Sequence, residues 1–74
     1  MKDHYEFGKR LTRLLQALDM TQMELSRRTQ LTPAAISELC AGIRDPSLHT
    51  IVRIMKVIPV KFETLVNMEN KDGT

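Results

Sequence analysis

The fold is decided by one stretch, residues 21–42, which reads TQMELSRRTQLTPAAISELCAG. It contains two helix starts. The first is Thr21, with Glu24 three residues later, and the second is Thr32, with Pro33 directly after it. A threonine N-cap followed three residues later by glutamate forms a capping box, and proline suits the first position of a helix. We therefore expect two short helices within this stretch.

The first of these helices is predicted at 22–29 and the second at 33–41, where Gly42 offers a left-handed C-terminus. Two short helices joined by a turn of about three residues form a helix-turn-helix, in which the second helix projects outward. Its apolar side chains, expected to be buried against the helices before and after it, are Ile36, Leu39 and Cys40. Its opposite face is then exposed, and a helix has the width of the DNA major groove.

A longer amphipathic helix is predicted before this stretch, at about 5–18. Asp3 and Glu6 form a possible capping box at its start. Its apolar residues recur at helical spacing and make one stripe, which consists of Phe7, Leu11, Leu14, Leu15 and Leu18.

Two further helices are predicted after it. The first runs from 48 to about 58, begins after Ser47 as N-cap and stops at Pro59. Its predicted inner face consists of Leu48, Ile51, Val52 and Met55. A short helix at about 61–68 follows.

These elements predict an all-α fold, a compact five-helix bundle that spans residues 1–68 and is followed by a polar, flexible tail at 69–74. The chain has 74 residues, 42% of them apolar, and a formal net charge of +2, which is compatible with a polyanion partner. Three aromatic residues are too few for the stacking platforms that bind single-stranded nucleic acid.

Other function classes find little support. Cys40 is the only cysteine, which excludes an internal disulfide and predicts a cytoplasmic setting. The sequence shows no signal peptide and no apolar run long enough to span a membrane. His4, His49 and one cysteine do not complete a zinc site, and a buried thiol is usually inert. We therefore expect no metal, no cofactor and no enzymatic activity.

One series of residues, in matching order and spacing, carries a resemblance to a known family. The series is Thr21-Gln22-x-Glu24-Leu25, Ile36-Ser37, Gly42, Arg44-x-Pro46-Ser47, and Val60 with Phe62 and Leu65. It resembles the phage repressor and Cro helix-turn-helix family, also called Xre-like, over roughly residues 7–66. The resemblance implies a λ-repressor-like five-helix fold. It also implies a transcriptional regulator, often a repressor, that binds a two-fold operator in double-stranded DNA as a homodimer.

The resemblance places contacts to the DNA backbone at Thr21 and Gln22. The start of a helix also offers free backbone amides and the positive end of the dipole to a phosphate. Arg44 matches a further backbone contact, and Lys9 and Arg10 are weaker candidates. The alternatives are that Thr21 is only a cap and Gln22 only a surface residue, and that Arg44 is a solvated loop arginine or one paired with Asp45.

The positions that read bases fall on Thr32, Pro33, Ala34, Ser37 and Glu38. None of these side chains can make the bidentate contact to a purine that Gln, Arg or Asn makes in many relatives. Glu38 can accept a hydrogen bond from a cytosine amino group, and Pro33 and Ala34 can contact thymine methyl groups. The alternative is that Pro33 and Ala34 merely start the helix.

Two departures from the family concern structure. Many relatives pair an arginine on the first helix with a glutamate at the end of the third, where this chain has Leu15 and Cys40. Both are uncharged, so the pair is replaced as a whole. The turn holds Gln30 where glycine is common, which costs on the order of 1 kcal/mol if the backbone there is left-handed.

The dimer is predicted to form through the C-terminal helix, at Phe62, Val66 and Met68, although a fraying tail would explain the same residues. No small-molecule ligand is expected. The competing hypothesis is a protein-interaction module that uses the same fold with little or no specific DNA binding. The Pro-Ala-Ala start of the 33–41 helix favours it, and the retained Gln22 and Arg44 oppose it.

Overall fold

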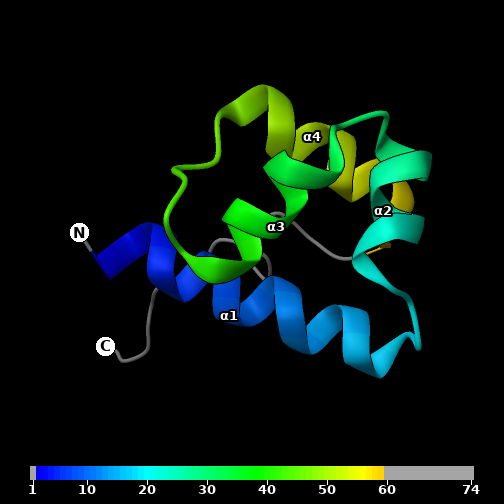
Figure 1. The fold of residues 1–74 in the computed structure, drawn as a ribbon, viewed down its shortest axis with the longest axis horizontal. Helices are drawn as coiled ribbons and strands as arrows, with labels where there is room; N and C mark the ends of the chain where they lie inside the picture. Colours follow the sequence, from blue (N-terminus) through cyan, green and yellow to red (C-terminus); the bar gives the residue numbers. More distant parts are fainter. Residues whose placement is uncertain (1, 60–74) are drawn as a thin grey trace.

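The computed structural model describes residues 2–59, which form four helices and no strand (Figure 1). The helices are α1 (Lys2–Ala17), α2 (Gln22–Thr29), α3 (Pro33–Ala41) and α4 (Leu48–Val57). The all-α class is thus confirmed for this range. The predicted fifth helix at 61–68 and the predicted tail at 69–74 lie outside the described residues, as do the predicted dimer contacts Phe62, Val66 and Met68.

The bounds of α2 and α3 agree with the prediction, because local capping groups fix them. The Thr21 hydroxyl accepts a hydrogen bond from the Glu24 amide at 3.0 Å, and the Thr32 hydroxyl accepts one from the Ala35 amide at 3.1 Å. The carboxylate of Glu24 binds two arginines of its own helix, so it does not complete the predicted capping box. At the end of α3, Gly42 adopts a left-handed φ of 78°.

The predicted start of the first helix is wrong. α1 begins at Lys2, so Asp3 lies inside the helix and is not an N-cap. The residues before the predicted start tolerate helical geometry, and no proline or glycine among them stops it. The helix therefore begins three residues earlier than predicted, at Lys2.

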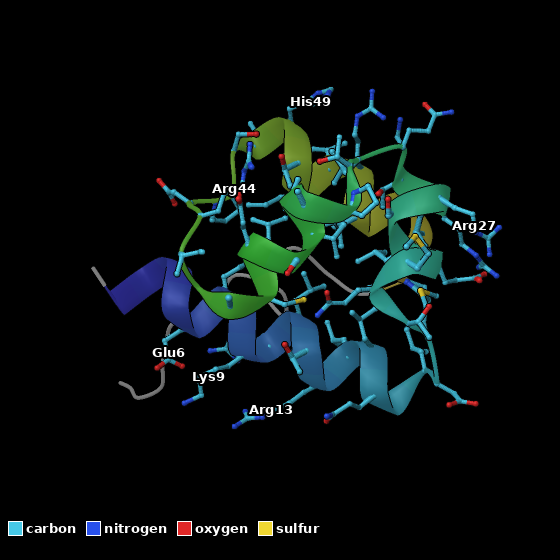
Figure 2. The ribbon with its side chains drawn as sticks, in the orientation of Figure 1. Glu6, Lys9, Arg13, Arg27, Arg44 and His49 are labelled. Carbon is cyan, nitrogen blue, oxygen red and sulfur yellow. The ribbon has the colours of Figure 1, made fainter. Side chains whose placement is uncertain are left out.

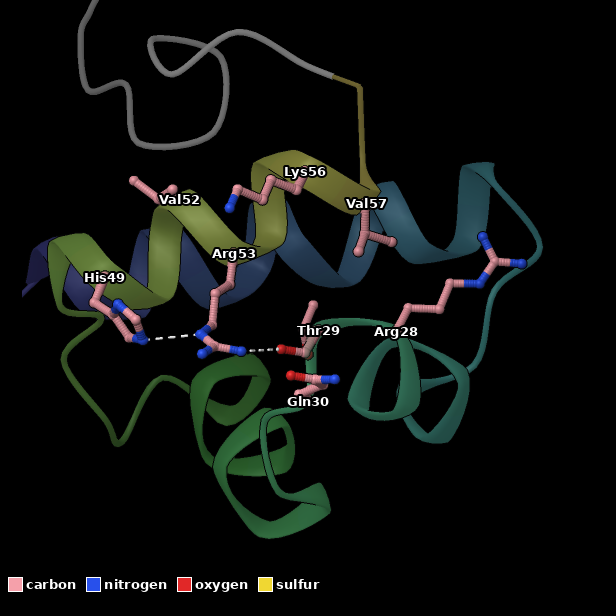
Figure 3. A pocket seen from close by; sticks show the side chains of 8 residues that line it. All are labelled: Arg28, Thr29, Gln30, His49, Val52, Arg53, Lys56 and Val57. Atoms are coloured by element: carbon pink, nitrogen blue, oxygen red, sulfur yellow. Dashed lines mark hydrogen bonds between the residues drawn. The ribbon is translucent and has the colours of Figure 1, made fainter.

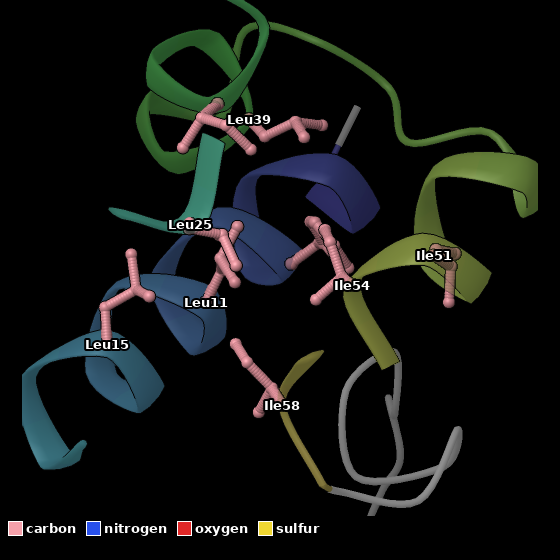
Figure 4. Packing of buried hydrophobic residues seen from close by; sticks show 9 residues of the cluster. Leu11, Leu15, Leu25, Leu39, Ile51, Ile54 and Ile58 are labelled. Carbon is pink, nitrogen blue, oxygen red and sulfur yellow. The ribbon is translucent and has the colours of Figure 1, made fainter. Parts of the chain in front are cut away.

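The core is built from all four helices (Figure 4). Its buried residues come from α1, α2, α3 and α4, together with one residue after α4. They are Phe7, Leu11, Leu15, Leu25, Ile36, Leu39, Ile51, Ile54 and Ile58. The apolar faces of the amphipathic helices thus meet in one cluster, which holds α3 by its inner side.

The main packing partner of α3 differs from the prediction. Its main neighbour is α1, followed by α2, whereas α4 packs against α2. The predicted packing of α3 against α2 is confirmed, and α3 shares the core cluster with α4, but the prediction missed α1. α1 can approach α3 closely because Gly8 lies at the crossing and has no side chain.

The inner face predicted for α4 is only partly correct. Ile51 is buried as expected, but Leu48 and Val52 are 67% and 42% exposed. The helix instead turns Ile54 toward the core, and Ile58 follows it there. The helix ends at Val57 because a residue before proline is pushed to an extended conformation, which Ile58 adopts with φ −100° and ψ 114°.

Within residues 2–59, two non-glycine residues adopt a left-handed backbone, and both lie at helix ends. Gln30 has φ 64° and ψ 22° at the end of α2, as the sequence suggested, and its amide donates to the Ser26 carbonyl at 2.9 Å. Asp19 has φ 56° after α1. There the amides of Asp19 and Met20 reach back to the carbonyls of Gln16 and Leu15, which is a Schellman ending.

We expect Gln30→Gly to stabilise the protein by about 1 kcal/mol, because glycine has no Cβ to strain a left-handed residue. The melting temperature should rise by roughly 4–8 °C, which thermal unfolding followed by circular dichroism would measure. The matched control is Gln16→Gly, the same exchange at an exposed helical position of α1, which should lower stability by roughly 0.5–1 kcal/mol. Equal effects at both sites would contradict the assignment.

Candidate nucleic-acid interface

The helix-turn-helix turn is held by two buried hydroxyl groups. Ser26 and Thr29 are 4% and 3% exposed. The Ser26 hydroxyl donates to the Leu31 carbonyl at 2.6 Å. The Thr29 hydroxyl donates to the Leu25 carbonyl at 2.7 Å and accepts from the Leu31 amide at 3.2 Å. Because these bonds connect α2 to the turn itself, they fix the direction in which α3 leaves it.

Arg53 connects α4 to the same turn, and sequence reasoning missed it. Its Nη1 donates to the Thr29 carbonyl at 2.8 Å, and its Nε donates to His49 Nε2 at 2.8 Å (Figure 3). The carbonyls at a helix C-terminus lack intrahelical partners and carry partial negative charge, so a guanidinium suits them. The only signal in the sequence is an arginine between two apolar residues of α4.

A hollow of about 360 Å³ lies beside this contact, between the end of α2 and α4. Arg28, Arg53 and Lys56 line it, together with His49. Arg53 already bonds to the turn, and Arg28 bonds to Glu24 at 2.8 Å. Two of the three cations that line the hollow, Arg53 and Arg28, thus have structural partners within the protein.

The predicted base-reading residues form the outer side of α3. Thr32, Pro33, Ala34 and Ser37 are exposed, and the Glu38 side chain is 44% exposed. The opposite side of the helix is in the core, where Ile36 and Leu39 are almost fully buried. α3 therefore presents one face with short side chains to solvent, and its base contacts stay a prediction.

The predicted phosphate seat is the start of α2. Thr21 and Gln22 are exposed there. The Thr21 side chain binds the Glu24 amide, and the Thr21 carbonyl accepts from the Leu25 amide at 3.0 Å. The amides of Gln22 and Met23 precede the first intrahelical bond and point out of the helix end, where a phosphate can reach them.

The cationic candidates are distributed over different parts of the fold. Arg44 lies in the loop between α3 and α4, where its Nη1 binds Glu38 Oε1 at 2.8 Å. The alternative partner suggested by the sequence was Asp45. Lys9 is exposed on α1, and Figure 2 shows it projecting from the edge of that helix away from Arg44. Arg10 is half-buried on the same helix. The structure thus brings Arg44 to α3 but does not bring Lys9 there.

Cys40 is half-buried at the end of α3. Burial raises the pKa of its thiol, and a hydrogen bond with Thr12 opposes that shift. Leu15, the other half of the replaced pair, is 4% exposed in the core. A thiol with a raised pKa carries little thiolate at neutral pH, so it is a poor nucleophile.

Residues 2–59 offer neither a metal site nor a membrane span. No group of three or more His, Cys, Asp or Glu side chains in this range is placed to hold a metal ion. None of the helices in this range is long and apolar enough to cross a membrane.

Comparison with known proteins identifies the class. Residues 11–65, well over half of the chain, match the helix-turn-helix family. The chain belongs to this family, and the membership supports a general role as a regulator that binds double-stranded DNA. No curated protein and no solved structure matches the chain.

Proposed function

We propose that the protein is a transcriptional repressor of the phage repressor and Cro type, which binds a specific sequence in double-stranded DNA by placing α3 in the major groove. The observation that carries the proposal is the two-sided character of α3. Its inner side is fixed in the core by Ile36 and Leu39, and its outer side is exposed from Thr32 to Glu38. A helix held in this way is rigid enough to position side chains against base edges.

Each part of the site takes a separate role. The amides at the start of α2 and the Gln22 side chain bind one phosphate, which positions the protein on the duplex. Thr32, Ser37 and Glu38 form hydrogen bonds with base edges, and Pro33 and Ala34 contact thymine methyl groups. The protein acts as a homodimer on half-sites about 34 Å apart. It performs no chemical reaction and needs no cofactor.

One observation favours a second function. Arg44 is already neutralised by Glu38, and Pro33 and Ala34 give the start of α3 an apolar character. A surface of this kind also suits a protein partner. The two functions differ in their response to salt, because only DNA binding releases the counterions condensed on phosphates.

The test is the affinity for a random-sequence duplex, measured by fluorescence anisotropy across a salt series. We expect log affinity to fall linearly with log salt concentration. Gln22→Ala should weaken binding to every duplex by a similar factor, since it removes a phosphate contact. The control is Gln16→Ala, an exposed glutamine of α1, which should leave affinity unchanged. Absence of binding at low salt, or an affinity that does not depend on salt, would favour the protein-interaction module.

A further inference from the structure

The two half-exposed residues Glu38 and Arg44 form an ion pair that joins α3 to the loop after it. Arg44 Nη1 lies 2.8 Å from Glu38 Oε1, and the two side chains are 51% and 44% exposed, respectively. The sequence assigns these residues to different tasks: Glu38 to a base and Arg44 to a phosphate. In the free protein, the Glu38 carboxylate that would contact a base is therefore bound to Arg44. The Arg44 guanidinium that would contact a phosphate is in turn bound to Glu38.

The backbone dictates this pairing. Gly42 turns the chain back with its left-handed φ of 78°, and its amide donates to the Leu39 carbonyl at 3.1 Å. The Ile43 amide donates to the Glu38 carbonyl at 3.1 Å. These two bonds are those of a Schellman ending, which returns the following residue over the last turn of the helix. Arg44 is thereby brought beside Glu38.

The pair contributes little to stability, because solvent screens half-exposed charges and about 0–1 kcal/mol is typical for such pairs. It therefore opens easily when a better partner is present. It matters for DNA binding because an arginine bound to a carboxylate brings no net charge to a phosphate. The ion pairs of Arg27 and Arg28 with Glu24 differ, since they lie within one helix at ordinary spacing.

We propose that Glu38 withholds Arg44 from the phosphates of arbitrary DNA and releases it when a cytosine occupies the position that Glu38 reads. On such a site the cytosine amino group donates to the Glu38 carboxylate, and Arg44 donates to a phosphate of the same half-site. Guanine and thymine present only acceptors to the carboxylate and repel it, and adenine places its N7 acceptor beside its amino donor. Cytosine is therefore the base that suits Glu38 best, and the pair stays closed on the others. This inference rests on the proposed function, and it makes the pair determine specificity by coupling a base contact to a backbone contact.

The first experiment is a double-mutant cycle on a random-sequence duplex, with wild type, Glu38→Gln, Arg44→Gln and the double variant. We expect Glu38→Gln to raise affinity at low salt by roughly two- to fivefold, the factor that corresponds to up to about 1 kcal/mol for the lost pair. It should also steepen the slope of log affinity against log salt by about 0.9 for each freed arginine. In the Arg44→Gln background, the same change should have little effect. Both residues are half-exposed, so the variants should fold, which circular dichroism would check.

The control for charge alone is Asp45→Asn, which removes the same charge from the exposed neighbour of Arg44. It should change affinity much less than Glu38→Gln does. If Glu38→Gln raises affinity equally with and without Arg44, Glu38 merely repels phosphates and the inference is wrong. If wild type shows no salt-dependent binding at all, the proposed function fails, and this inference fails with it.

The second experiment is selection of bound sequences from a random duplex pool by wild-type protein. We expect a cytosine at one position of each half-site, and replacing it by thymine should lower wild-type affinity by roughly tenfold or more. Glu38→Gln should lose most of this discrimination, and the wild-type salt slope should be steeper on the cytosine site than on the thymine site. Equal slopes on both sites would contradict the release of Arg44 even if the preference for cytosine is found.

Discussion

Replacing Gly8 with alanine is expected to destabilise the protein by about 3 kcal/mol, at the upper end of the usual cost of overpacking. A Cβ atom at this position of α1 would lie 2.4 Å from the Leu39 carbonyl oxygen and 2.8 Å from that of Cys40. Both are backbone atoms at the end of α3, where the Leu39 carbonyl also accepts the Gly42 amide. They cannot swing aside as the end of a flexible side chain would, so α1 and α3 must separate.

The local preference of the chain runs in the opposite direction, which makes the test sharp. In an isolated helix, alanine is favoured over glycine by about 1 kcal/mol. A peptide of α1 should therefore gain helix content from Gly8→Ala, whereas the whole protein should lose roughly 10–20 °C in melting temperature. Gln16→Ala, an exposed position of the same helix, should be neutral or slightly stabilising. An equally stable Gly8→Ala protein would show that the two helices do not cross as closely as the structure places them.

Gly8 also shows which part of the fold the sequence leaves open. The bounds of α2 and α3 could be predicted because their caps, Thr21, Thr32 and Gly42, act on residues next to them in the chain. The need for glycine in α1 comes from α3, which is distant in sequence. In the sequence alone, Gly8 is only a residue of low helix propensity within a helical pattern.

The inner face of α4 was mispredicted for a related reason. Apolar residues cover more than half of the circumference of this helix, and Val52 and Ile54 lie toward opposite ends of that arc, so periodicity alone does not choose between them. Which of the two side chains is buried depends on how α4 packs against α2. The hydrogen bond from Arg53 to the Thr29 carbonyl fixes that packing. A side chain that points correctly for one packing direction is exposed in another, as Leu48 is.

The candidate site likewise has features that the sequence predicts and features that it does not. The exposure of Ser37 and the cap at Thr21 follow from local helix geometry and could be predicted. The pairing of Glu38 with Arg44 could not, because it depends on how the loop after α3 returns to the helix. Asp45 was the nearer carboxylate in sequence, yet the Schellman ending directs Arg44 to α3.

The second large effect is expected from Arg53→Met, which should destabilise the protein by about 2 kcal/mol. Hydrogen bonds that involve a charged group typically contribute about 1.5–3 kcal/mol. The Arg53 guanidinium donates such a bond to the Thr29 carbonyl at 2.8 Å. Methionine retains much of the apolar stem, so the loss reports mainly on the guanidinium. Removing it leaves a carbonyl at the end of α2 without its partner from α4.

The matched control is Lys56→Met, which removes a cation from the same hollow but from an exposed side chain. It should change the free energy of unfolding, measured by urea denaturation, by no more than about 0.5 kcal/mol. If both variants lose the same stability, net charge around the hollow is responsible, and the bond to Thr29 contributes nothing specific. Because that bond connects α4 to the turn before α3, a specific loss of stability at Arg53 should also be accompanied by weaker DNA binding.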